Sequence, residues 1–431
     1  MTYLLQQGRH RRRRIGMLVA LAACACSKLT DVSAPDVVQL PSLDNAAGAE
    51  ALRVGSLGGF ALVYGGSRRG QITTSGAMAD EFFNASSGAI DLAAADIRVV
   101  PDPNTSYPYL DVQRSRLDAK RAISALQEYT PAKRAEIAEQ FALSGYTEIF
   151  LGENMCSGIP LGAIVNGNPS YGTPLSTDEL LARAEADFDS AAKYAGSDAR
   201  ILDLALVGRG RASLDRGDFA GAASAVASVP ASYVYEVQYS AAQPNGVFKI
   251  VNLSKWLTVA DREGQNGVDY RSAQDPRLMT MLIGKGADGF TDVYAFTRYS
   301  SLSSPIALAS GVEARLIEAE AALHAGDAST ALQILNALRA TVPGLGPLTL
   351  QSTTDGRVDQ LFGERAFWLF ATGHRLGDLR RLLRQYGRIQ SAVFPTGAYK
   401  NGQRYGTDVD FTPDVSQLGN PNFTGCSSRG A

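Results

Sequence analysis

The sequence has few of the residues from which metal sites and nucleophilic sites are built. It contains three histidines and four cysteines in 431 residues, and it has no Cys-x-x-Cys pair. Because histidine and cysteine are the usual zinc ligands and both are scarce, we expect no structural zinc site. Gly-x-Ser-x-Gly, the phosphate-binding Gly-x-x-x-x-Gly-Lys-Ser/Thr and His-Glu-x-x-His motifs are also missing. We therefore expect no metal, no cofactor and no catalytic residue.

The chain also lacks an excess of basic residues. The chain has 41 lysines and arginines against 43 aspartates and glutamates. Residues 1–23 contain five arginines and no acidic residue, which leaves 36 basic against 43 acidic side chains in the rest. A body with this excess of negative charge has no electrostatic reason to bind a phosphate backbone. We expect no nucleic-acid partner.

The apolar segment near the N-terminus, residues 15–23, is too short to span a bilayer. It follows the basic run 9–14 and ends in Leu-Ala-Ala before Cys24, an order typical of a secretion signal. The small residues before Cys24 resemble the bacterial lipobox, in which the cysteine becomes the lipidated first residue. Cys26 and an ordinary signal peptide remain the alternatives. We expect a lipoprotein signal peptide at 1–23, lipidation of Cys24, a tether at 24–43 and one folded domain at 44–431.

Two cysteines remain in the body of the chain, Cys156 and Cys426. In an oxidising export compartment they could form a disulfide that ties the C-terminal tail to the helical body. Two isolated thiols are the alternative, with Cys156 as an apolar filler. Spacing along the sequence does not separate the two possibilities.

Two stretches in the middle of the chain resemble one another. Residues 205–229 and 314–338 each contain an Ala-rich helical pattern, a Gly-Asp turn and a second Ala-rich helical pattern. Small residues at fixed positions let antiparallel helices pack closely, as in tetratricopeptide hairpins. We therefore expect a predominantly α-helical fold with a loop-rich face and a few short strands, and with divergent tetratricopeptide-like hairpins near 131–229 and 309–341.

Apolar periodicity and capping signals predict the remaining elements. A helix at 131–153 would begin with Pro131 in its first turn, and a helix at 177–194 would be capped by Ser176 or Thr177. Further helices are expected at 45–64 and 110–129, and short strands at 234–237 and 247–251 on either side of a Pro-Asn-Gly turn.

The longest helix-like run is Leu361–Arg384, which we expect to be one continuous, largely buried helix. Glu364 and Arg375 lie too far apart along such a helix to pair with each other, so each should find a partner on another element. Gly373 removes a side chain in mid-run, which is costly unless a neighbouring segment must come close. This run therefore predicts a structural clamp rather than a catalytic element.

The same run carries a family resemblance. Glu364-Arg365, Gly373-His374-Arg375 and Asp378-Leu379-Arg380-Arg381 resemble the C-terminal signature of SusD/RagB-type outer-membrane nutrient-binding lipoproteins, although Thr372 stands where that pattern usually has an acidic residue. Asp275-Pro276-Arg277 and the turn that begins with Glu153-Asn154 are similar to other segments of the family. The resemblance covers most of the chain after residue 23.

The resemblance implies a lipid-anchored protein that is exposed on the surface of the outer membrane. Such a protein caps a TonB-dependent, SusC-like transporter and captures an oligosaccharide or peptide for uptake, without catalysis. A tetratricopeptide scaffold lipoprotein in outer-membrane assembly and a lipid-anchored glycoside hydrolase are the rival interpretations. The hydrolase would need two carboxylates roughly 5–10 Å apart in a cleft.

Ligand-binding residues are predicted from chemistry, because saccharides are held by aromatic faces and by polar side chains. Aromatic residues in stretches rich in Gly and Pro are the candidates, although packing against the helical body is the alternative for each. Asp80, next to Glu81 in an irregular span, is the candidate acid; a structural acid pair is its alternative. The full set of candidates is Asp80, Tyr107, Tyr109, Trp256, Tyr270, Tyr294 and Tyr299.

Overall fold

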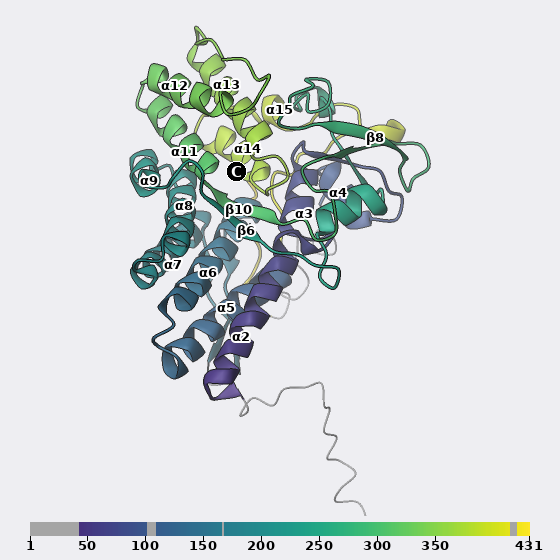
Figure 1. Ribbon diagram of the computed structural model, residues 1–431. Coiled ribbons are helices and arrows are strands. Elements are labelled where there is room, and N and C mark those ends of the chain that lie inside the picture. Colours follow the sequence, from purple (N-terminus) through teal and green to yellow (C-terminus); the bar gives the residue numbers. More distant parts are fainter. Residues whose placement is uncertain (1–42, 101–108, 166–167, 414–419) are drawn as a thin grey trace, which may run out of the picture.

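The structure, a computed structural model, describes residues 43–100, 109–165, 168–413 and 420–431 (Figure 1). The predicted signal peptide, the lipidation site at Cys24, most of the predicted tether and Tyr107 lie outside these ranges. Within them, no helix is both long and apolar enough to cross a membrane.

The chain is predominantly helical, which confirms the predicted fold class. The helices are α2 Ala46–Ala61, α3 Gln71–Met78, α4 Ile90–Asp96, α5 Tyr109–Tyr129, α6 Arg134–Asn154, α7 Thr177–Ala195, α8 Ala199–Asp215, α9 Phe219–Val226, α10 Gly246–Phe248, α11 Gly311–His324, α12 Ala328–Arg339, α13 Thr354–Trp368, α14 Arg375–Arg384 and α15 Gln390–Val393. The strands are β1 Phe82–Asn84, β2 Ile159–Pro160, β3 Ala163–Val165, β4 Asn168–Ser170, β5 Pro174–Leu175, β6 Val234–Val237, β7 Leu257–Val259, β8 Thr280–Lys285, β9 Asp292–Phe296 and β10 Ile306–Ser310.

The two similar stretches form matching helical hairpins, α8–α9 and α11–α12. The turns contain Gly217 at φ 83° and Gly326 at φ 86°, left-handed conformations that favour glycine. Asp218 and Asp327 then cap the second helix of each hairpin through their side chains. Helix α11 packs against both α8 and α9, so the two hairpins are neighbours although a long insertion separates them in the sequence.

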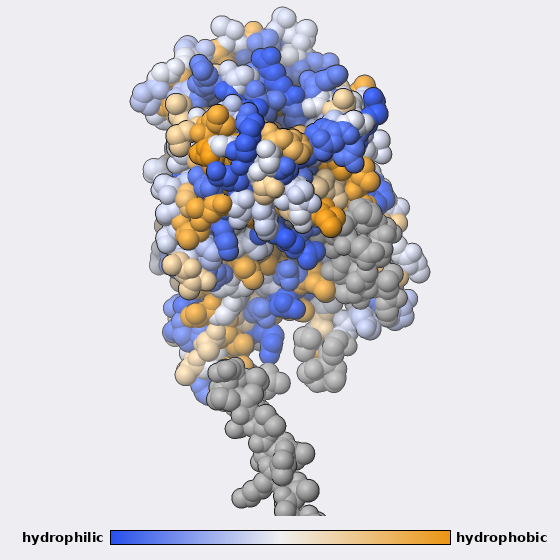
Figure 2. Space-filling view, turned by 90° about the vertical axis from the view of Figure 1, so that its right-hand side faces the viewer, coloured by the Kyte–Doolittle hydropathy of each residue, from blue (hydrophilic) through white to orange (hydrophobic). Residues whose placement is uncertain are grey.

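Helices α2 and α5–α9 stack side by side as one arm of the molecule, β8 lies on the other side, and β6 and β10 lie between them (Figure 1). The strands occur as antiparallel pairs, β1–β7, β6–β10, β2–β5, β3–β4 and β8–β9. The β8–β9 hairpin lies near α3 and α4 in this view. Figure 2 shows that side of the molecule, where hydrophobic and hydrophilic surface alternate.

Helix α7 begins as the sequence predicts. The Ser176 side chain accepts from the backbone N–H of Glu179, and the Glu179 side chain accepts from the backbone N–H of Ser176, which completes a capping box. The predicted start of the preceding helix is wrong, because α6 begins at Arg134 and Pro131 lies in the turn before it. The predicted strand at 247–251 is also wrong. Asn245 accepts from the N–H of Phe248 and caps a short helix there, and β6 pairs with β10 instead.

The expected continuous helix over Leu361–Arg384 is broken, because α13 ends at Trp368 and α14 begins at Arg375. Ala371 has φ 55° and Gly373 has φ 77°, so the chain turns sharply between the helices. Other elements hold this turn: the Ala371 N–H donates to a Glu81 carboxylate oxygen at 2.8 Å, and the Gln71 side chain donates to the Gly373 carbonyl at 3.2 Å. Tertiary hydrogen bonds therefore override the helical periodicity of the sequence.

Cys156 and Cys426 are joined by a disulfide, with their Cα atoms 5.9 Å apart. Cys156 follows α6 and is fully buried. Backbone hydrogen bonds between Ser157 and Ser428 accompany the link. The C-terminal tail is therefore attached to the helical body by covalent and hydrogen bonds together.

Candidate functional site

The residues that resemble the family signature lie in the interior, between helices. Arg375 donates to both carboxylate oxygens of Asp80, at 2.6 and 2.8 Å. Arg365 likewise donates to both oxygens of Asp378, at 2.9 and 2.8 Å. Glu364 accepts from Arg277 of the Asp-Pro-Arg segment at 2.6 Å. Glu364 and Arg375 thus each pair with a residue on another element, as the sequence predicts.

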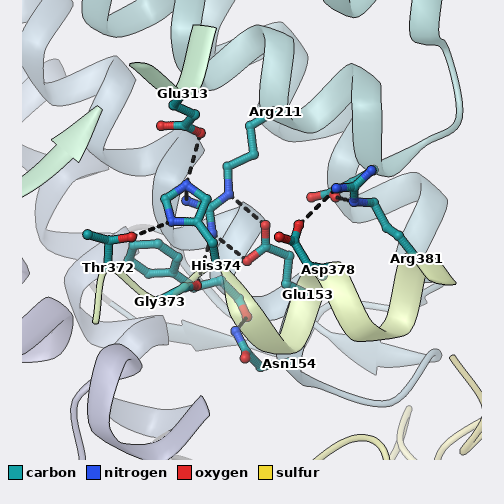
Figure 3. A network of polar contacts seen from close by, with 12 residues as sticks. Glu153, Asn154, Arg211, Glu313, Thr372, Gly373, His374, Asp378 and Arg381 are labelled. Atoms are coloured by element: carbon teal, nitrogen blue, oxygen red, sulfur yellow. Dashed lines mark hydrogen bonds and ion pairs between the residues drawn. The ribbon is translucent and has the colours of Figure 1, made fainter. Parts of the chain in front are cut away.

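Figure 3 shows the centre of this network, at the start of α14. Arg211 on α8 donates to both oxygens of Glu153 at 2.6 and 2.7 Å, and its Nη1 lies 2.9 Å from Nε2 of His374. The Thr372 hydroxyl is 2.8 Å from Nδ1 of His374, and Glu313 is 3.0 Å from Nε2. Burial and the nearby Arg211 guanidinium lower the pKa of His374. The imidazole is therefore neutral near pH 7 and belongs to a buried structural network.

A cavity of about 490 Å³ lies where segments distant in the sequence meet. We call it the Tyr294 cavity. Strand β7, the turn after it, strand β9 and the C-terminal segment 398–405 supply its walls. Its lining includes four aromatic residues and several charged side chains. The lining residues used below are Phe83, Thr258, Asp261, Glu263, Arg271, Asp292, Tyr294, Tyr399, Lys400 and Tyr405.

Arg271 and Tyr294 form one wall of the Tyr294 cavity. The guanidinium carbon of Arg271 lies 4.1 Å from the centre of the Tyr294 ring, a stacked cation–π arrangement. The Nε of Arg271 is buried and has no hydrogen-bond partner among the described residues. The Tyr294 N–H donates to the Thr258 hydroxyl at 2.8 Å, which fixes β9 against β7. The wall therefore presents an aromatic ring and a cation side by side.

Carboxylates of the Tyr294 cavity are held by neighbouring groups. One oxygen of Asp261 accepts from the backbone N–H groups of Arg271 and Ser272, both at 2.9 Å. Burial acts to raise the pKa of Asp261, but these hydrogen bonds outweigh it and lower the pKa. Asp292 pairs with Lys285 at 2.7 Å. Both carboxylates are in place to accept hydrogen bonds from hydroxyl groups.

The opposite wall is aromatic. The rings of Phe83 and Tyr399 have centroids 5.3 Å apart, and those of Tyr399 and Tyr405 are 5.1 Å apart and nearly perpendicular, at 78°. The Lys400 ammonium donates to the Asn84 carbonyl at 2.5 Å and lies 5.2 Å from the Phe83 ring centre. The cavity therefore has aromatic groups on two sides with polar groups between them.

A second cavity of about 600 Å³ lies along α5. Arg116, Lys120, Arg121 and Arg183 line it, but Tyr129 is its sole aromatic lining residue. Lys120 is paired with Asp187 on α7 at 2.6 Å. Aromatic surface is concentrated in the Tyr294 cavity, so the Tyr294 cavity is the candidate site.

The ligand-binding predictions are partly corrected by burial. Tyr294 lines the Tyr294 cavity. Asp80 is fully buried and bound to Arg375, and Tyr270 is fully buried among aromatic rings at 4.9 Å from Phe370. Tyr109 and Tyr299 are buried as well, and their hydroxyls donate to the backbone carbonyls of Pro160 and Ala371. These four side chains have no surface to offer a ligand, because internal packing and hydrogen bonds engage them.

Trp256 is half-buried beneath the Arg68 guanidinium, 5.6 Å from its ring centre, and does not line the Tyr294 cavity. Sequence reasoning also missed Arg271, which directly follows the predicted Tyr270. The two residues lie in a turn at 270–273, where Tyr270 is fully buried while Arg271 lines the cavity. An aromatic-basic pair in a polar stretch was the local signal.

Among the described residues no group of three or more His, Cys, Asp or Glu side chains could hold a metal ion. The Tyr294 cavity offers hydrogen-bond donors, acceptors and aromatic faces instead. This arrangement suits a polar, uncharged or weakly charged organic ligand.

Comparison with known proteins places the chain in a structural context. Residues 313–419 match the model of the SusD family. A putative sugar binding protein from Bacteroides vulgatus has 13% sequence identity and a TM-score of 0.64, over 90% of this chain and 99% of that one. A SusD/RagB family protein from Bacteroides thetaiotaomicron has 12% sequence identity and a TM-score of 0.63, over 87% of this chain and 94% of that one. A laminarin binding SusD-like protein has 15% sequence identity and a TM-score of 0.61, over 81% of this chain and 96% of that one. No curated protein matches the sequence.

These similarities confirm the resemblance to the SusD/RagB family. The family model matches the segment that contains the second helical hairpin, the α13–α14 turn and its ion pairs. The solved structures share the fold over most of the chain. Because their sequence identities are 12–15%, these structures show a common fold and do not show the ligand of this chain.

Proposed function

We propose that this protein, which has the SusD fold and carries the SusD family segment at residues 313–419, binds saccharide in the Tyr294 cavity. The observation that carries the proposal is the Arg271 guanidinium stacked on Tyr294 in a cavity that three further aromatic residues and several charged side chains line.

The chemistry of the Tyr294 cavity fits a sugar ring. Aromatic faces pack against the C–H surfaces of a pyranose, and Phe83, Tyr294 and Tyr399 supply such faces. Asp261 and Asp292 accept hydrogen bonds from sugar hydroxyls, and Arg271 donates to ring or hydroxyl oxygens. Two of the structurally similar proteins are described as sugar binding and laminarin binding, which supports the same ligand class for this chain.

The test is calorimetric titration of the purified protein with a panel of oligosaccharides, with short peptides as the competing class. Replacing Tyr294→Ala removes the stacking face, and we expect affinity for the preferred saccharide to fall by about tenfold or more, since each tenfold corresponds to about 1.4 kcal/mol. The matched control is Tyr171→Ala, an exposed tyrosine that does not line the cavity. Binding of peptides but no saccharide, or equal affinity of both variants, would reject the proposal.

We further propose that the protein binds its ligand without catalysis. Each lining carboxylate is engaged: Asp261 by backbone amides, Asp292 by Lys285 and Glu263 by the Tyr405 hydroxyl at 3.0 Å. None is poised as a free general acid opposite a free base, which a glycoside hydrolase requires. Prolonged incubation with a bound oligosaccharide should release no shorter product, as chromatography would show.

The cellular role that we propose follows from the family. Residues 1–23 would be a signal peptide, Cys24 the lipidated residue and 24–43 the tether to the outer membrane, where a TonB-dependent, SusC-like transporter would receive the ligand. Co-purification of the detergent-solubilised native protein through a C-terminal tag tests the partnership. A TonB-dependent barrel in near-equal amount is the expected result. Assembly factors in its place would favour the scaffold interpretation.

A further inference from the structure

A pair of buried carboxyl groups, one of which lines the cavity, holds the aromatic wall of the Tyr294 cavity. Asp96 ends α4, and Glu263 opens the short 3-10 turn after β7. Asp96 is fully buried and Glu263 is 5% exposed. The Tyr399 hydroxyl donates to Oδ2 of Asp96 at 2.5 Å, and the Tyr405 hydroxyl donates to Oε1 of Glu263 at 3.0 Å. Each carboxyl group therefore anchors one tyrosine of the wall.

The second oxygen of each group, Oδ1 of Asp96 and Oε2 of Glu263, is buried and accepts no hydrogen bond from an N–H or hydroxyl group in the described ranges. The two side chains are hydrogen-bonded to one another, with Asp96 as the acceptor. A carboxyl–carboxyl hydrogen bond needs a proton, because two buried carboxylates in contact cannot both be ionised. Glu263 is therefore the neutral partner and donates to Asp96.

The surrounding charges agree with this assignment. Asp96 also accepts from the Asn84 N–H at 2.8 Å and is stabilised as an anion by Lys400. Glu263 faces the negative Asp80 as well as Asp96, which disfavours a charge on it. On the other side, Arg98 interacts with Glu263 electrostatically but directs hydrogen bonds to the carbonyls of Asp408 and Pro395.

Burial and these neighbours shift both groups in one direction. Burial, followed by the charge of Asp96, raises the pKa of Glu263 well above its usual range. Burial also raises the pKa of Asp96, to about 6. The pair therefore retains its proton to a higher pH than isolated carboxyl groups do.

The orientation of the tyrosines has a direct consequence for the Tyr294 cavity. The hydroxyls of Tyr399 and Tyr405 donate inward, to Asp96 and Glu263, and are not available to a ligand. The rings are left as the contact surface. The pair thus keeps this wall of the cavity aromatic and fixes its geometry.

We propose that the proton shared by Glu263 and Asp96 controls ligand binding in the Tyr294 cavity, with both residues acting as positioning residues for Tyr399 and Tyr405. Loss of the proton places two negative charges in contact, separates the carboxylates and displaces the segment that carries both tyrosines. The inference rests on the proposed function, because the ligand concerned is the saccharide proposed for this cavity.

The first test is a pH profile of saccharide affinity between pH 6.5 and 9, measured with the intact protein. Glu263→Gln keeps an acceptor for Tyr405 and a donor for Asp96 but has no proton to lose. We expect wild-type affinity to fall by about tenfold or more across this range and the affinity of the variant to change by about twofold or less. Asp189→Asn, an exposed acidic residue that does not line the cavity, is the matched control and should keep the wild-type profile. A Glu263→Gln profile that parallels the wild type, or a flat wild-type profile, would overturn the proposal.

A second test needs no ligand and separates this inference from the proposed function. Hydrogen exchange of the unliganded protein, corrected for the intrinsic pH dependence, should accelerate over residues 398–405 between pH 7 and 9 in the wild type. Glu263→Gln should remove that acceleration, and so should Asp96→Asn, which serves if the first variant does not fold. If exchange switches as expected but no saccharide binds at any pH, the proposed function fails. Exchange that is independent of pH, together with saccharide binding, rejects the shared proton alone.

Discussion

Removal of the Asp80 carboxylate should destabilise the protein severely, because it leaves Arg375 as an unpaired charge in the interior. The Asp80 side chain is fully buried and that of Arg375 is 7% exposed. Asp80 receives two hydrogen bonds from Arg375 and one from the Val268 N–H at 3.0 Å. Breaking a buried ion pair from one side typically costs about 3–5 kcal/mol, and the orphaned amide adds to it. We expect Asp80→Ala to lower the free energy of unfolding by about 4 kcal/mol.

Urea unfolding with the disulfide intact measures this change through the midpoint at constant slope. The double variant Asp80→Ala/Arg375→Met removes both charges and should recover at least half of the loss, because the penalty comes mainly from the uncompensated guanidinium. Asp359→Ala is the matched control: its partner Arg388 is at the surface, where an ion pair contributes about 1 kcal/mol or less.

Two outcomes would refute this reasoning. A loss below about 1 kcal/mol for Asp80→Ala would show that the pair is not effectively buried. Simple additivity of the two single substitutions would show that they are not coupled. Unchanged stability with lost saccharide binding would restore Asp80 as a ligand-binding residue.

Three further predictions concern the disulfide, the α13–α14 turn and a buried acid. Cys426→Ala breaks the link to Cys156, 270 residues away, and should reduce the free energy of unfolding by about 2–5 kcal/mol in non-reducing urea titrations; no loss would mean that the link is dispensable. Gly373→Ala forces alanine to φ 77° and should cost about 1–2 kcal/mol, whereas Gly363→Ala, where an added Cβ meets nothing within 4 Å, should not destabilise. Burial raises the pKa of Glu81 to about 8, so its folded form holds a proton that the unfolded form loses near pH 4–5. The stability that the Glu81 proton contributes is fully present below pH 4–5 and is lost as the pH rises through about 8. Glu81→Gln should therefore flatten the pH dependence of unfolding, and an unaltered slope would contradict the shift.

Elements with local signals could be predicted from the sequence. The capping box at Ser176 and the repeated Gly-Asp turns act through neighbours in the chain, so α7 and both hairpins follow from local chemistry. Helices α3 and α4 were not expected, because they are short and lie in a glycine-containing span with weak periodicity. Their stability comes from burial among other elements.

Two of the wrong predictions, a strand at 247–251 and one continuous helix at 361–384, arise from contacts between distant parts of the chain. Valine and isoleucine favour strands, but residues 247–251 are helical because Asn245 caps the start of this turn. The partner of β6 is β10 instead. The periodicity of Leu361–Arg384 is genuine on both sides of Trp368, yet bonds from Glu81 and Gln71 hold a turn in its middle. Such contacts join residues about 290–300 positions apart, which no local pattern reports.

The candidate site could be predicted only in part. Chemistry selected Tyr294 among the loop aromatics, and it lines the Tyr294 cavity. It did not select Glu263, Tyr399 or Tyr405, because these residues gain a role only when the C-terminal segment folds over the turn after β7. Burial, which sequence composition does not show, separates Tyr294 from Tyr270.

The most direct test of the central claim is hydrogen exchange of the intact protein with and without a saccharide that it binds. We expect protection in 258–271, 291–294 and 398–405, the segments that meet at the Tyr294 cavity, and no change along α5 and α7. Protection confined to α5 and α7 would place the ligand in the second cavity and contradict the assignment of the site.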